Sequence, residues 1–153
     1  ACNILASNLS LNVPISSAVT ILQMALGDAI GIREFGRSHV SNTGLSALGL
    51  QGAVCQFDVS VATIDSLVHD AVLPPPTAIK IDVEGGELAL LEGAKSAFAS
   101  HPPRWVIIEL EPEGESFDQA HAWFTSRHYS ISRVPRDSGM IEARENYLAT
   151  FNG

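Results

Sequence analysis

The chain has 153 residues, the size of one ordinary domain, and is long enough to bury a substantial core. Its 46% apolar and 17% charged residues indicate a folded chain and argue against intrinsic disorder. The formal net charge of -8 disfavours nucleic acid and anionic membrane surfaces as partners, because both select basic patches.

The two cysteines, Cys2 and Cys55, are too few for a disulfide framework and lack a metal-type spacing. We therefore interpret them as reduced thiols in a cytoplasmic protein. We expect no membrane span, since no apolar run reaches about 18 residues, and no signal peptide, since the N-terminus lacks its charged and apolar regions.

The N-terminal third predicts a short helix followed by two strands. Isoleucine and leucine spacing indicates a helix from Asn3 to Asn12, which ends because Pro14 follows. Val19 to Ala25 is an apolar run with β-branched residues, typical of a buried strand. A second strand is predicted from Ile30 to Arg37, where Gly31 marks a bulge or a close backbone approach.

The middle of the chain predicts a long loop, a strand and a short helix. Ser38 to Gly52 has the serine, glycine and asparagine content of a loop. Ala53 to Val61 alternates as a strand does, and Thr63 to His69 is predicted to be a short helix or a turn, with Thr63 as a candidate cap. Pro74 to Pro76 is a stiff connector inside one domain.

The C-terminal half predicts the clearest elements. A helix is expected from Glu87 to Ser100, with Glu92 and Lys95 as an exposed pair, and a central apolar strand from Trp105 to Leu110. A helix over Ser116–Arg127, with Ser116 as its N-cap, precedes two closing strands, Tyr129–Val134 and Asn146–Phe151, separated by a turn at Pro135–Gly139. This order of strands and helices is typical of an α/β fold.

Between the proline connector and the long helix lies a strand, a glycine turn and a helix start, Ala78 to Leu88. Its apolar residues alternate with Lys80, Asp82 and Glu84, so the three charges share one face. Such charges are costly on a parallel strand unless they are paired or border a wet cleft. Ligands bind outside the carboxyl ends of strands in open α/β sheets, where Asp82 and Glu84 are expected.

The segment IKIDVEGGELALLEGA, Ile79 to Ala94, resembles the signature of the FkbM-type family of S-adenosylmethionine-dependent methyltransferases. Flanking pieces agree with that family: ALGDA at 25–29, TIDSL at 63–67 and VIIE at 106–109. The resemblance extends roughly from Asn8 to Leu148. It implies a Rossmann-like methyltransferase fold, an α/β three-layer sandwich, with residues 1–153 forming a single domain.

One departure concerns the cofactor. The family opens with a strand and a glycine-rich loop that cradles S-adenosylmethionine, and this sequence has no such segment. We therefore expect the chain to be the C-terminal portion of the domain, lacking the first β-α unit or units, and to be weakly active or inactive alone.

The resemblance also implies cofactor-binding residues, namely Leu26, Gly27 and Asp28 at the end of the first strand. A carboxylate there commonly accepts a hydrogen bond from the adenine amino group, and a carboxylate is an acceptor-only group. The alternative is that Asp28 is an ordinary turn residue beside Gly27.

Asp82, Glu84 and Glu109 are the candidate catalytic residues, because the family places methyl donor and acceptor at these strand ends. A carboxylate there could take a proton from a substrate hydroxyl, stabilise the sulfonium cation or orient the substrate. Glu111 could complete the acidic cleft, and clustering would raise the pKa of one member. The structural alternative for Asp82 is a pair with Lys80 or a cap on the next helix.

The same carboxylates could instead hold Mg²⁺ or Ca²⁺. The five histidines are scattered and are interpreted as surface or cap residues, with His39 the one to watch, so we assign no metal ligand. Asp65 is expected to cap or anchor a turn.

The sequence thus favours an S-adenosylmethionine-dependent O-methyltransferase acting on a small-molecule or sugar hydroxyl. Two alternatives stay open: a non-catalytic binding or assembly module of the same fold, and a cation-dependent enzyme. The sheet edge left by the absent strands favours a homodimer.

Overall fold

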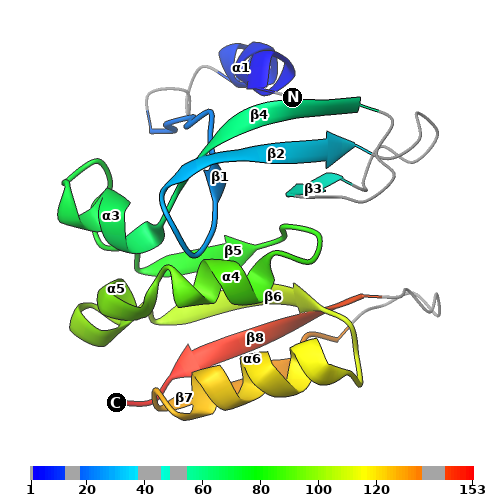
Figure 1. Cartoon of the computed structure of the whole chain (residues 1–153). Helices are drawn as coiled ribbons and strands as arrows, with labels where there is room; N and C mark the ends of the chain where they lie inside the picture. Colours follow the sequence, from blue (N-terminus) through cyan, green and yellow to red (C-terminus); the bar gives the residue numbers. More distant parts are fainter. Residues whose placement is uncertain (1, 13–17, 38–45, 49–54, 136–143) are drawn as a thin grey trace.

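The computed structural model describes residues 2–12, 18–37, 46–48, 55–135 and 144–153, and it forms two four-stranded sheets with helices (Figure 1). Sheet A has the strand order β1-β4-β2-β3. Its strands are β1 (Ala25–Leu26), β2 (Gly31–Arg37), β3 (Ser46–Leu48) and β4 (Cys55–Ala62). The β1–β4 pair is parallel, and β2 pairs antiparallel with both β3 and β4.

Sheet B has the order β5-β6-β8-β7. Its strands are β5 (Ala78–Ile81), β6 (Trp105–Leu110), β7 (Tyr129–Arg133) and β8 (Glu145–Phe151). The β5–β6 pair is parallel, whereas β8 runs antiparallel to both β6 and β7. The predicted α/β class and the two closing strands are therefore confirmed, and the closing strands pair antiparallel.

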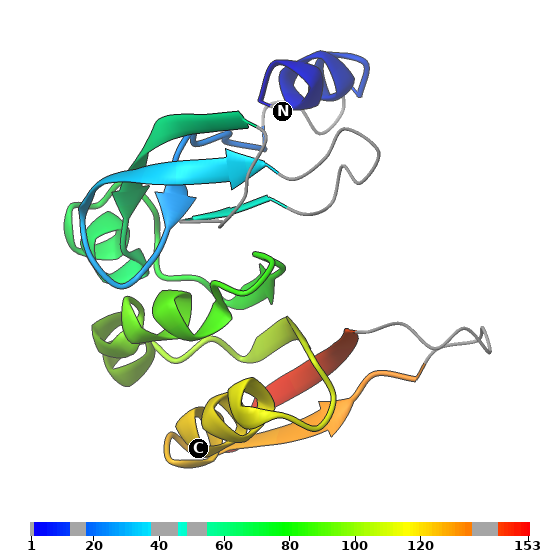
Figure 2. The same cartoon turned by 45° about the vertical axis from the view of Figure 1, so that its right-hand side comes forward.

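The helices are α1 (Cys2–Ser10), α3 (Ile64–His69), α4 (Glu87–Glu92), α5 (Lys95–Ser100) and α6 (Glu115–Thr125). Figures 1 and 2 show α4, α5 and α6 on the same side of sheet B. The hydrophobic core lies between these helices and sheet B. It includes Ile81, Val106 and Ile108 from the strands, and Leu91 and Phe124 from the helices. No helix in the described ranges is both long and apolar enough to cross a membrane.

The prediction of one continuous helix from Glu87 to Ser100 is wrong. The segment forms two helices, α4 and α5, with a break at Gly93. A β-carbon on Gly93 would lie 2.1 Å from the backbone oxygen of Gly27. The carbonyl of Gly93 accepts the N–H of Asp65 at 2.9 Å. The Asp65 carboxylate then accepts the N–H groups of Ser96 and Ala97, at 3.0 and 2.8 Å, and so caps α5. The break is therefore made by a contact with distant residues.

The structure also corrects three smaller predictions, which concern the first strand, Gly31 and the N-cap of α6. The strand predicted from Val19 to Ala25 is reduced to β1, since only Ala25 and Leu26 pair with β4. Gly31 is in regular register with Val61, and a β-carbon there would meet nothing within 4 Å, so it is neither bulge nor close approach. Helix α6 begins after Gly114, so Ser116 is not its N-cap.

The loop predicted from Ser38 to Gly52 contains a short strand, β3, within it. The rest of that segment, with His39, and most of the turn predicted at Pro135–Gly139 lie outside the described residues. Thr63 does cap α3 as predicted, because its side chain and that of Ser66 exchange hydrogen bonds with each other's backbone N–H.

Candidate functional site

Three carboxylates meet where β5 and β6 end. Asp82 directly follows β5, Glu84 lies in the turn after it, and Glu109 is the fifth residue of β6. The parallel register that places Ile81 beside Ile108 brings these ends to one edge of sheet B. One oxygen from each carboxylate lies within 4.8 Å of the others. The structure therefore brings together the three residues that the sequence predicts; we call them the acidic cluster.

The turn after β5 directs Glu84 into this cluster. Glu84 has φ 51° and Gly85 has φ 96°, so two successive residues adopt left-handed backbone. This conformation suits Gly85 but costs a residue with a β-carbon roughly 1 kcal/mol or more. The N–H of Gly85 donates to a Glu87 carboxylate oxygen at 3.1 Å, which helps to hold the turn.

Two cations border the acidic cluster. Lys80 Nζ donates to Asp82 Oδ2 at 3.1 Å, with both side chains about half exposed. Arg144 Nε lies 3.5 Å from Glu109 Oε2. The pair predicted as the structural alternative for Asp82 is thus present. An exposed pair of this kind contributes only about 0–1 kcal/mol, so it leaves Asp82 free to exchange partners.

Burial and the neighbouring Asp82 carboxylate raise the pKa of Glu109, against the opposing effect of Arg144. Desolvation dominates because it disfavours the charged form. A carboxylate with a raised pKa binds a proton more readily than an ordinary glutamate, and a general base needs this property. Clustering adds to this shift, because the Asp82 carboxylate raises the pKa of Glu109 further.

Arg144 is the site residue that the sequence analysis missed. Its guanidinium donates to the Glu87 carboxylate and, at 2.9 Å, to the backbone carbonyl of Glu109. Glu87 is the buried charged residue of the described core, with 4% of its surface exposed. Arg144 therefore joins the start of α4 to the end of β6, beside the acidic cluster. No local pattern marks it, because its partners lie 57 and 35 residues away.

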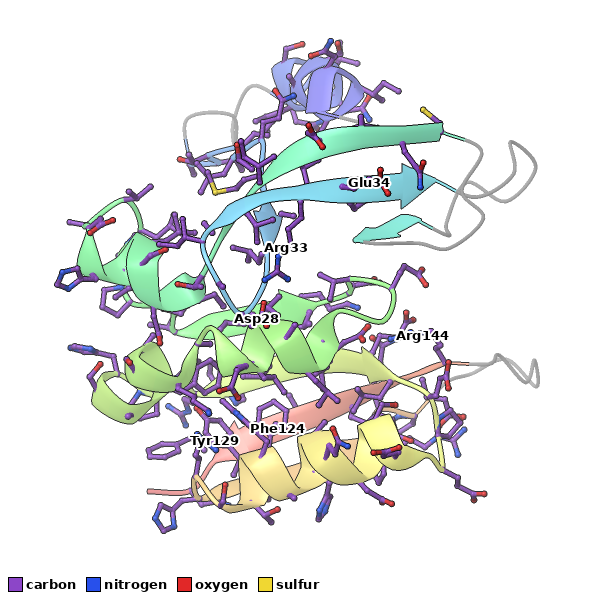
Figure 3. The ribbon with its side chains drawn as sticks, in the orientation of Figure 1. Asp28, Arg33, Glu34, Phe124, Tyr129 and Arg144 are labelled. Atoms are coloured by element: carbon purple, nitrogen blue, oxygen red, sulfur yellow. The ribbon has the colours of Figure 1, made fainter. Side chains whose placement is uncertain are left out.

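Asp28 lies apart, in the connection between β1 and β2. Its carboxylate is exposed and accepts the Arg33 guanidinium at 2.6 Å (Figure 3). This hydrogen bond holds the pKa of Asp28 below its usual range. Gly27 is buried, and its N–H donates to the Ala62 carbonyl at 3.0 Å, whereas Leu26 is half-buried against the core. Asp28 is thus an ion-paired acceptor at the end of a parallel strand.

Other candidates take structural roles. Asp65 caps α5, as described above, which confirms its expected anchoring role. Glu111 is exposed and is not a member of the acidic cluster. Cys55 is an exposed free thiol.

Comparisons with known proteins agree with this geometry. Residues 4–131 match the family described as the methyltransferase FkbM domain. The hexuronic acid methyltransferase AglP of Haloferax volcanii is 29% identical over 124 residues, which are 80% of this chain and 50% of AglP. The chain thus spans about half the length of that curated relative.

A solved structure gives the same result for the fold. The crystal structure of the methyltransferase FkbM from Methylobacillus flagellatus KT superposes with a TM-score of 0.63 at 19% identity, over 98% of this chain and 33% of that one. At this identity the likeness concerns the fold alone. The match over residues 4–131, which include β5, the glycine turn and β6, shows that the chain belongs to the FkbM methyltransferase domain family.

Proposed function

We propose that this chain carries the acid-base side of an S-adenosylmethionine-dependent O-methyltransferase acting on a sugar hydroxyl. The observation that carries the proposal is the acidic cluster at the carboxyl ends of two parallel strands, within the part that matches the family. Ligands of open α/β sheets bind at such strand ends.

The residues present fit two parts of S-adenosylmethionine. The exposed Asp28 carboxylate, at the end of β1, suits an amino-group donor such as that of adenine. The acidic cluster suits a cationic sulfonium, since within the described ranges its three carboxylates are bordered by two cations, Lys80 and Arg144. When bound, this cofactor supplies an electrophilic methyl group.

Glu109 is the proposed general base. Its raised pKa gives it the proton affinity for the task, and it is half-buried beside Asp82. It would take the proton that an acceptor hydroxyl loses as that oxygen gains the methyl group. Asp82 and Glu84 would orient the hydroxyl and balance positive charge, which contributes through positioning and electrostatics.

The acceptor class is inferred from AglP, whose name describes it as a hexuronic acid methyltransferase. A hexuronic acid offers both hydroxyl and carboxylate oxygens. The acidic cluster would repel a substrate carboxylate, since like charges close together are unfavourable. We therefore infer that a sugar hydroxyl is the oxygen methylated here.

The test measures cofactor binding and methyl transfer separately. Calorimetric titration with S-adenosylhomocysteine should give saturable one-site binding, weakened at least tenfold by Asp28→Asn. With labelled S-adenosylmethionine and glucuronic acid or its methyl glycoside, Glu109→Gln should lower label transfer by about 10²-fold or more, as loss of a general base does. Glu111→Gln, outside the acidic cluster, is the matched control.

Absence of any binding by a cooperatively folded chain would contradict the assignment of a cofactor site to these residues. Equal transfer by wild type and Glu109→Gln would contradict the role of Glu109. The two results separate cofactor binding from acid-base chemistry.

A divalent-cation-dependent enzyme is the second candidate, favoured by the same 4.8 Å grouping of three carboxylates. Mg²⁺ and Ca²⁺ prefer such oxygen ligands, although Lys80 and Arg144 already offset part of the charge. This candidate predicts that millimolar Mg²⁺ or Ca²⁺ raises the melting temperature saturably, and that Glu109→Gln abolishes the rise. An unchanged melt would eliminate it.

A further inference from the structure

The absence of a side chain at Gly93 serves a contact, not the conformation of its own backbone. Its φ of -75° is negative, so the backbone there does not need a glycine. The space around it is the constraint, because a β-carbon would lie 2.1 Å from the carbonyl oxygen of Gly27 and 3.1 Å from the β-carbon of Thr63. Gly93 therefore permits a close approach between the α4–α5 break and the end of β1.

The oxygen that Gly93 contacts belongs to the peptide unit that carries Asp28. A peptide bond is planar, so the Gly27 carbonyl oxygen and the Asp28 α-carbon move together as one rigid unit. The N–H of Gly27 donates to the Ala62 carbonyl at 3.0 Å, which ties the chain just before this unit to β4. The contact with Gly93 is a second restraint. The position of Asp28 therefore depends on the α4–α5 break as well as on β4.

The α4–α5 break is itself held in place. The Gly93 carbonyl accepts the N–H of Asp65 at 2.9 Å. The Asp65 carboxylate caps α5, which begins two residues after Gly93. Asp65 follows Ala62 by three residues, so both restraints on the peptide before Asp28 lead back to one short segment at the end of β4.

The carboxylate of Asp28 is restrained by a different partner. Its Oδ1 accepts the Arg33 guanidinium at 2.6 Å, and Figure 3 shows Arg33 directed from β2 toward it. A carboxylate offers about four lone-pair sites, so this bond leaves capacity for a further N–H donor. An exposed acceptor on a fixed peptide unit is what a directional hydrogen bond to a ligand requires.

We propose that Gly93 is a positioning residue for the cofactor: by leaving room for the Gly27 carbonyl, it places the Asp28 carboxylate for the adenine amino group. The inference rests on the adenine contact proposed above for Asp28. A β-carbon at Gly93 would have to displace the Gly27 oxygen by about 1 Å to reach an ordinary carbon–oxygen separation of about 3.3 Å. Binding groups need placement within about 0.5 Å, so the hydrogen bond to adenine would be lost.

The experiment compares two ligands by calorimetric titration. One is S-adenosylhomocysteine, and the other is its analogue with hydrogen in place of the adenine amino group. The wild type should bind the first about tenfold more tightly or better, as a hydrogen bond to a charged group implies. Gly93→Ala should reduce this preference to about threefold or less, by weakening the binding of S-adenosylhomocysteine alone. A merely structural effect would weaken both ligands equally and keep the preference.

Gly31→Ala is the matched control. It is the same substitution, three residues beyond Asp28, and a β-carbon there would meet nothing within 4 Å. It should leave both affinities unchanged. If Gly93→Ala does not unfold cooperatively, Asp65→Ala is the second variant, because it loosens the α4–α5 break by removing the cap of α5. It should lower the preference about twofold or more.

The outcomes distinguish this inference from the proposed function. A wild-type preference that is retained in the folded variants, or an equal loss for both ligands, would overturn the role of Gly93 and leave the cofactor site standing. A wild type that binds both ligands equally, or binds neither, would contradict the adenine contact of Asp28 and the inference with it.

Discussion

Replacing Arg144 with methionine should destabilise the protein strongly. The Arg144 and Glu87 side chains are 19% and 5% exposed, so their ion pair is mostly screened from water. Removing one partner of a buried pair costs about 3–5 kcal/mol, because the other charge stays buried without compensation. After the substitution, the N–H of Gly85 at 3.1 Å would be the remaining hydrogen bond described for the Glu87 carboxylate.

The assay is equilibrium unfolding in urea, followed by far-ultraviolet circular dichroism. In a thermal melt, a loss of about 3–5 kcal/mol in the free energy of unfolding corresponds to a fall in melting temperature of roughly 6–20 °C, at about 2–4 °C per kcal/mol for a chain of this size. Lys95→Met is the control, since its pair with Glu92 is about half exposed on both sides. That control should cost only about 0.3–0.5 kcal/mol.

A second substitution separates charge from packing. In the double variant Arg144→Met with Glu87→Gln, no buried charge remains, so we expect at least 1–2 kcal/mol to be recovered relative to the additive sum. A loss below about 1 kcal/mol in Arg144→Met, or strict additivity in the double variant, would refute the view that Arg144 neutralises Glu87.

The remaining predictions concern the cap, the helix break and the acidic cluster. Asp65→Ala should lower the free energy of unfolding by about 1–2 kcal/mol, since two α5 N–H groups lose their acceptor; an unchanged urea midpoint would contradict this. Gly93→Ala should cost at least 1–3 kcal/mol, because its β-carbon would collide with the Gly27 oxygen, whereas Gly31→Ala, with open space around it, should not destabilise. Because the pKa of Glu109 is raised above 4.5, the native state binds this proton more tightly than the unfolded chain. Wild-type stability should therefore fall as the pH rises from that value through the raised pKa, and Glu109→Gln should lack this fall in unfolding curves measured across pH 4–8.

Local patterns in the sequence were enough to predict most of the strands and helices. Alternation and apolar runs predict β2, β4, β6, β7 and β8, and the Thr63 cap predicts α3. The meeting of Asp82, Glu84 and Glu109 was also predictable, because the carboxyl ends of adjacent parallel strands share one edge. The resemblance around the glycine turn also predicted that the functional site lies at this edge.

Tertiary structure decided the features that depend on residues far apart in the sequence. Gly93 breaks a continuous helical pattern because it packs against the Gly27 backbone and bonds to Asp65. Arg144 reaches Glu87 across 57 residues, which no periodicity encodes. The apolar run of β6 predicted a central strand, yet Trp105 and Ile107 are exposed, because burial requires a neighbouring layer that the described residues do not supply on that face. Periodicity reports what a segment prefers locally, whereas exposure, helix breaks and charge pairing depend on which distant groups occupy the adjacent space.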